Sequence, residues 1–140
     1  MRRFLWPFLL GLMVSLGFGL GVASGAIYLH TTTVSVQITS GVKDVAFYED
    51  GAASVPWFSE SISMETNDAW LETRWLGNLG SSDVTVNLSV HGNTGFGMVL
   101  FAPAGPYFLA SGEVLSVEVT VYALPTAVDG NYGFTIAVEE

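Results

Sequence analysis

The chain has 140 residues, about the length of one domain, and half of its residues are apolar while only 12% are charged. This composition excludes intrinsic disorder, because disordered chains are poor in apolar residues and rich in charge. The chain has no cysteine, which excludes disulfides, thiolate nucleophiles, iron–sulfur clusters and the copper site of a cupredoxin.

The charged residues are distributed unevenly. Two arginines precede an uncharged run at 4–29, and after that run two basic residues stand against all thirteen acidic ones. Two bases and thirteen acids give residues 31–140 a net charge of −11. A segment this acidic repels the phosphate backbone of nucleic acids and the anionic headgroups of lipids. We therefore expect no nucleic-acid partner.

Residues 1–30 are predicted to be a transmembrane anchor or a signal segment. As a helix, the uncharged run would extend about 39 Å, enough to cross a bilayer core of about 30 Å. The arginines before it predict a cytoplasmic amino terminus, which places residues 31–140 outside the cytoplasm. The small residues at 23–26 also fit a signal-peptide cleavage site, and cleavage would release a secreted domain. The sequence leaves both alternatives open.

Small residues within this hydrophobic segment are spaced four apart. Such rows allow two helices to approach closely in lipid, so they mark a candidate helix–helix contact face. The candidate contact residues are Gly17, Gly21 and Gly25 in one row, and Gly19 and Ala23 in the neighbouring row. The alternative is that small residues are simply common in membrane helices.

Residues 31–140 are predicted to form seven to nine β-strands. Apolar and polar residues alternate clearly at 84–91, 115–122 and 132–138, as in strands with one buried face. Weaker strands are expected at 34–38, 44–48, 57–63, 68–76 and 96–101. Turn residues separate them every eight to twelve positions. The pattern predicts an all-β, antiparallel β-sandwich with no helix after residue 30.

Three motifs in the second half suggest a family. They read NLGSSDVTVNL at 78–88, LASGEVLSVEV at 109–119 and GNYGFTI at 130–136. In this order they resemble the immunoglobulin-like or fibronectin-like domains of prokaryotic, especially archaeal, surface proteins. The resemblance covers about residues 43–138 and departs from the family at Ser111, where a proline is usual. It implies an immunoglobulin-like fold at the cell surface and no particular activity.

The sequence contains no recognisable catalytic motif. The only histidines, His30 and His91, lack metal-site spacing, and there is no G-x-S-x-G nucleophile motif. A calcium site is a weaker alternative, because the acidic residues near predicted loops lack the D-x-D-x-D-G pattern. These residues are Asp44, Glu49, Asp50 and Asp129. We therefore expect no catalytic residue, no cofactor and no metal site.

Aromatic residues and one strand are candidates for protein contacts. Trp70 and Trp75 are an odd number of positions apart, so a regular strand directs one inward and the other outward; a bulge that turns both inward is the alternative. Segment 31–39 has neither charge nor proline, so we expect it to pair within its own sheet or with a neighbouring subunit. The interface candidates are Trp57, Trp70, Trp75, Val34, Val36 and Ile38.

One modification site is also predicted. Asn87-Leu88-Ser89 is an N-glycosylation acceptor pattern, and the alternation of its strand places Asn87 on the solvent face.

Together these features predict a non-enzymatic, membrane-anchored, extracytoplasmic subunit with a structural or assembly role, such as a component of a surface filament or envelope. One alternative is an accessory single-pass subunit of a larger membrane complex. A solute-binding or enzymatic domain is a third hypothesis.

Overall fold

A computed structural model of the chain describes residues 31–140. These residues form two packed β-sheets with no helix, which confirms the prediction of an all-β fold. The predicted amino-terminal helix, with its glycine rows, lies outside the described residues.

Nine strands make up the described part of the chain, which agrees with the predicted number. They are β1 (Thr31–Ser40), β2 (Val45–Tyr48), β3 (Ser59–Glu65), β4 (Ala69–Asn78), β5 (Val84–Gly92), β6 (Gly97–Ala102), β7 (Tyr107–Leu109), β8 (Val114–Ala123) and β9 (Gly130–Glu139).

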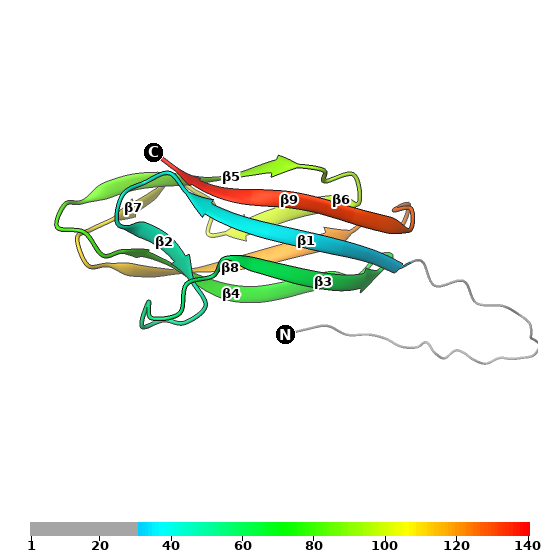
Figure 1. Cartoon of the computed structure of the whole chain (residues 1–140), viewed down its shortest axis with the longest axis horizontal. Helices are drawn as coiled ribbons and strands as arrows, with labels where there is room; N and C mark the ends of the chain where they lie inside the picture. Colours follow the sequence, from blue (N-terminus) through cyan, green and yellow to red (C-terminus); the bar gives the residue numbers. More distant parts are fainter. Residues whose placement is uncertain (1–30) are drawn as a thin grey trace, which may run out of the picture.

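Successive strands lie in opposite sheets (Figure 1). The odd-numbered strands form a five-stranded sheet in the order β3-β1-β9-β5-β7, and the even-numbered strands form a four-stranded sheet in the order β2-β4-β8-β6. Every connection between described strands therefore passes from one sheet to the other, and no strand pairs with its neighbour in sequence.

One strand pair departs from the predicted antiparallel arrangement. β1 and β9 run parallel, with Thr32 opposite Gly130 and Ser40 opposite Val138. The described chain therefore starts at one end of the sandwich and finishes at the other (Figure 1). We call the end near Thr31 the proximal end, and the end near Ser40 and Glu140 the distal end.

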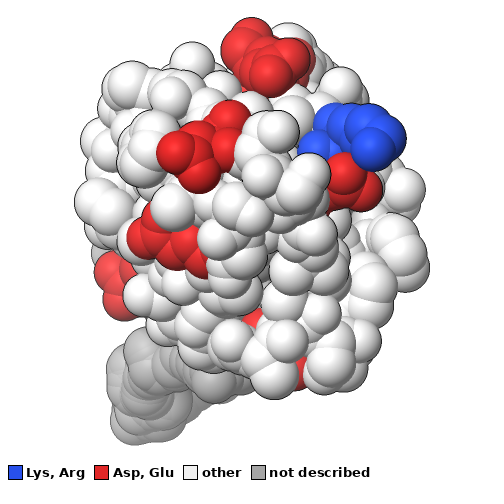
Figure 2. Space-filling model, turned by 90° about the vertical axis from the view of Figure 1, so that its left-hand side faces the viewer, with Lys and Arg blue, Asp and Glu red and all other residues white. Residues whose placement is uncertain are grey.

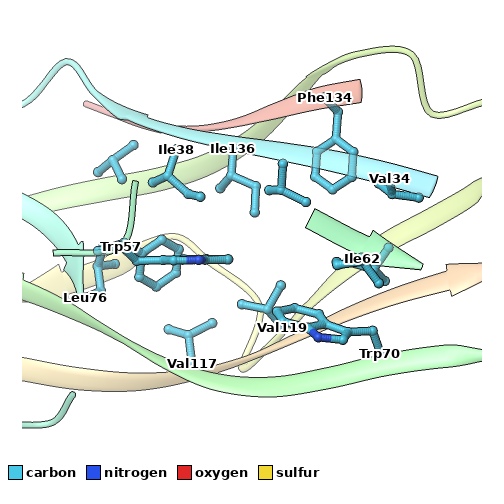
Figure 3. Packing of buried hydrophobic residues seen from close by; sticks show 14 of the residues in the cluster. Val34, Ile38, Trp57, Ile62, Trp70, Leu76, Val117, Val119, Phe134 and Ile136 are labelled. Carbon is cyan, nitrogen blue, oxygen red and sulfur yellow. The ribbon is translucent and has the colours of Figure 1, made fainter. Parts of the chain in front are cut away.

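The core lies between the two sheets and is built from the alternate residues of each long strand (Figure 3). The predicted inward faces at 115–121 and 132–138 are confirmed, because their apolar residues are buried or partly buried against the core. Burial of each aliphatic side chain contributes about 1.5–3 kcal/mol. The central strands supply Val34, Val36 and Ile38 from β1, Val117, Val119 and Val121 from β8, and Phe134, Ile136 and Val138 from β9.

Strand β7 is absent from the predicted strands. It has three residues and follows a proline-rich loop, so it carries too little alternation to be recognised in the sequence. In the structure, Tyr107 and Leu109 are buried on either side of the exposed Phe108. The Tyr107 hydroxyl donates a hydrogen bond to the Pro103 carbonyl at 2.6 Å, which holds the preceding loop against the strand.

The burial of β1 leads to a first prediction. Val36 is 1% exposed, so Val36→Lys should lower the free energy of unfolding by about 3–5 kcal/mol, the cost of burying a charge without a partner. Gln37→Lys, the control, changes an exposed neighbour on the same strand and should cost less than about 0.5 kcal/mol. Denaturant unfolding of both variants checks this, and equal midpoints would mean that β1 is not packed as described.

Candidate functional site

The one described histidine takes part in a cluster that resembles a catalytic triad in composition but not in geometry. Ser89 Oγ lies 2.9 Å from His91 Nε2, and Glu139 Oε2 lies 3.2 Å from the same nitrogen. A triad requires the hydroxyl and the carboxylate on different ring nitrogens. The Ser89 hydroxyl, followed by His91, lowers the pKa of the exposed Glu139 carboxyl. The arrangement is a surface hydrogen-bond cluster and offers no route for proton relay.

Among the loop carboxylates considered for calcium, Asp50 has several local partners. Asp50 accepts hydrogen bonds from the Ser54 amide at 2.9 Å and the Val55 amide at 2.8 Å, and also from the Ser54 hydroxyl. These donors stabilise the ionised form, so the pKa of Asp50 lies below its ordinary value, the Ser54 hydroxyl having the largest effect. Within residues 31–140, no three acidic or histidine side chains are placed to hold a metal ion together.

A shallow hollow opens at the distal end, with a volume of about 260 Å³. Asp44, Asp83 and Glu140 contribute carboxylates to its wall, beside Lys43. Figure 2 looks at the molecule from this end and shows acidic groups distributed over it.

The floor of this hollow is held by a buried asparagine. Asn78 Nδ2 donates to the Ser82 carbonyl at 2.8 Å and to the Leu109 carbonyl at 3.2 Å, while Asn78 Oδ1 accepts from the Gly80 amide at 3.0 Å. Since these bonds join the loop 79–83 to the end of β7, the role of Asn78 is to hold the distal loops together.

Most of the interface candidates are core residues. Val34, Val36 and Ile38 face the opposite sheet, and Trp57 is 1% exposed. Trp70 and Trp75 project to opposite faces of β4, as their odd spacing predicts: Trp70 is buried, while Trp75 is partly exposed on the outer face. The loop after β2 covers Trp75, because a Cβ at Gly51 would lie 3.2 Å from its indole nitrogen.

No pattern in the sequence indicated that Arg74 is buried. Its guanidinium carbon lies 4.8 Å from the ring centre of Trp57 and 5.5 Å from that of Trp70. Arg74 Nη2 lies 3.1 Å from Glu60 Oε1 on β3, and Nη1 lies 3.6 Å from Glu72 Oε1 on its own strand. A planar cation suits both the aromatic faces and the carboxylates. This Arg74 cluster joins the side of β4 to β3 in the other sheet.

The strongest candidate for a contact surface is the outer face of the four-stranded sheet. In the sheet register, Leu71 on β4 and Leu100 on β6 lie on either side of Thr120 on β8. Met98 lies beside Tyr122 one row closer to the proximal end. Leu71, Met98 and Leu100 are 43%, 43% and 53% exposed. Neighbouring exposed apolar side chains on one face are typical of a protein contact.

The sequence contained a usable sign of this surface. In Gly97-Met98-Val99-Leu100-Phe101-Ala102 both alternate faces are apolar, whereas β1, β5 and β8 place polar residues outward. A strand that is apolar on both sides faces either a second layer or a partner.

The remaining predicted positions are placed as follows. Asn87 is exposed on β5, so the acceptor pattern is accessible. The candidate contact residues Gly17, Gly19, Gly21, Ala23 and Gly25, and also His30, lie outside the described residues. No helix within residues 31–140 is long and apolar enough to cross a membrane.

Comparisons of the chain with protein-family models, with curated proteins and with solved structures find no match.

The Arg74 cluster gives a second prediction. Arg74→Ala should lower the free energy of unfolding by about 3 kcal/mol, because it removes the cation beside two carboxylates and the guanidinium that packs against two indoles. Lys43→Ala is the control, since it removes the same charge from a side chain that is 91% exposed, and should change stability by less than about 0.5 kcal/mol. Thermal unfolding of both variants measures the loss of stability. Equal losses for Arg74→Ala and Lys43→Ala would refute a stabilising role for Arg74.

A third prediction concerns acid. Since the pKa of Asp50 is lowered in the folded state, its carboxylate stabilises the fold fully above the unfolded pKa of about 3.9. That contribution is lost as the pH falls through the lower, folded pKa. Asp50→Asn should therefore be less stable than the native chain at neutral pH, and the difference should vanish in stronger acid. Urea unfolding of both proteins across the acid range measures this difference in stability. A difference that stays constant with pH would contradict the prediction.

Proposed function

We propose that the chain is a non-enzymatic, membrane-anchored subunit whose β-sandwich lies outside the cytoplasm and has a structural or assembly role. The observation that carries this proposal is the polarity of the molecule. An uncharged apolar run, 4–29, immediately precedes the strand that starts at the proximal end. The carboxylates of the hollow lie at the distal end. An anchor before Thr31 would hold the proximal end at the bilayer and place the carboxylates of the hollow at the far end of the sandwich, away from anionic headgroups.

We propose further that the sandwich is immunoglobulin-like in the sense of the surface domains that its motifs resemble. Two packed, mainly antiparallel sheets support this proposal. So does Tyr132, whose hydroxyl donates to the Val128 carbonyl at 2.8 Å in the manner of the corner tyrosine of such domains. Sandwich families share the two-sheet architecture without always sharing the strand order. The proposal therefore concerns the architecture and not the strand order, which in this chain alternates between the two sheets.

Self-assembly is the form of the proposal that we favour over an accessory role in a larger complex. The outer face of the four-stranded sheet supports a protein contact of some kind, because Leu71, Met98 and Leu100 are exposed there. The glycine rows of the amino-terminal segment supply a second candidate contact in the membrane. Purification of the native chain with unrelated subunits at fixed stoichiometry would favour the accessory role instead.

The fourth prediction tests the anchor. The intact mass of the native protein should include the segment 4–29, and the protein should remain in membranes after alkaline washing, because only an inserted segment resists that treatment. A mass lacking about the first 25 residues would show a cleaved signal segment and would overturn the anchor.

The same preparation tests the helix contact. Gly21→Ile should weaken association of the full chain in detergent, because a β-branched side chain keeps the backbones apart, and should leave unfolding of the sandwich unchanged. Leu20→Ile, outside both glycine rows, is the matched control. Unchanged association of the Gly21→Ile chain would remove the contact face from the proposal.

A further inference from the structure

The free edge of β6 differs from the edges formed by β2, β3 and β7. Among the described residues, β6 ends the four-stranded sheet and pairs only with β8. Natural edge strands are protected from pairing by charge, proline, bulges or shortness. β3 carries Glu60 and Glu65, β7 has three residues, and β2 has four with a further bridge to Pro56.

β6 has none of these protections. Its six residues, Gly97–Ala102, include no charged residue and no proline. An unprotected strand edge presents unpaired backbone N–H and C=O groups in a row, which is a template for another extended strand.

Charge decides which strand can occupy that edge. A domain with a net charge of −11 repels a second copy of itself wherever carboxylates meet. At β6 no carboxylate stands on the strand, and the nearest in the register is Glu118 on β8, opposite Ala102. A basic partner would find no anionic side chain on β6 to bind. An uncharged strand of matching length fits this edge, and β6 of a second copy is one.

We propose that β6 pairs antiparallel with β6 of a second copy of this chain, about a two-fold axis through Val99. Residues facing each other across an antiparallel pair lie on the same face of the sheet. With the axis at Val99, Met98 of each copy lies opposite Leu100 of the other on the outer face. An axis at Leu100 would instead put Met98 opposite Ala102, so the axis at Val99 covers more apolar surface.

The pairing joins the two four-stranded sheets into one continuous sheet of eight strands. We call the contact between the two β6 strands the seam. Glu118 lies on β8, one strand away from the seam, and neighbouring strands in a sheet are about 4.8 Å apart. The Glu118 carboxylates of the two copies are therefore separated by both β6 strands. The inference rests on the proposed function, since it names the partner that an assembly subunit would meet at this surface.

Charge variants of the full chain test both the pairing and its register. Met98→Lys with Leu100→Lys sets lysines opposite lysines at two places on the seam and should raise the dissociation constant about tenfold or more. Met98→Lys with Leu100→Glu sets opposite charges face to face and should retain association. Leu71→Lys, on the same face but two strands from the seam, is the control. Sedimentation of the full chain in detergent, in a Gly21→Ile background to reduce contacts between helices, measures all three.

Cross-linking in native membranes gives a second measurement. Because the chain contains no cysteine, Val99→Cys introduces a single thiol. Residues paired across antiparallel strands have Cα atoms about 4.5–5.5 Å apart, within the range of a disulfide. We expect a disulfide-linked dimer of this chain on mild oxidation. Phe108→Cys, at an exposed position of β7, should yield none.

The outcomes separate this inference from the proposed function. A cross-link from Val99→Cys to a chain of different mass, or equal association of the two paired-charge variants, overturns the pairing of copies even if the protein is anchored in the membrane. If the intact mass shows that the native chain lacks residues 4–29, and the Val99→Cys variant still forms the dimer, the pairing is supported and the anchor is overturned.

Discussion

The whole sandwich depends on one constraint: each connection between described strands crosses from one sheet to the other. No strand can pair with the strand that follows it, so no part of a sheet is formed by a local hairpin. Both sheets must therefore form together, held by the apolar side chains between them, with β1, β8 and β9 supplying much of that layer.

The parallel pairing of β1 with β9 sets the direction of the molecule. Antiparallel pairing would have brought the start and the finish of the domain to one end, whereas the observed register sends them to opposite ends. The separation of the proposed anchor from the carboxylates of the distal hollow thus follows from a single strand pair. The lateral surface between the two ends is where β6 leaves uncharged backbone and apolar side chains exposed.

The two basic residues of the domain have different roles. Lys43 is an exposed side chain at the distal end, beside Asp44. Arg74 is buried between two indoles and contacts a carboxylate of the opposite sheet. Because β3 and β4 belong to different sheets, the contact between Arg74 and Glu60 links the two sheets at this side of the sandwich. Because Arg74 is buried, its positive charge is missing from the surface, and the surface is more negative than the composition alone indicates.

The amino-acid sequence by itself determined the local properties of the domain: that it consists of strands, which face of 115–121 and 132–138 is buried, and that Trp70 and Trp75 project oppositely. These follow from a period of two, which is visible in a short window. Only the tertiary structure decided the strand order, the parallel β1–β9 pair, β7, the burial of Arg74 and the position of β6 at an edge. Pairing between strands depends on contacts between distant segments, and the same alternating strand can lie at the centre or at the edge of a sheet. The interface candidates on β1 became core residues for this reason, while the sheet register was needed to bring the exposed leucines of β4 and β6 onto one face.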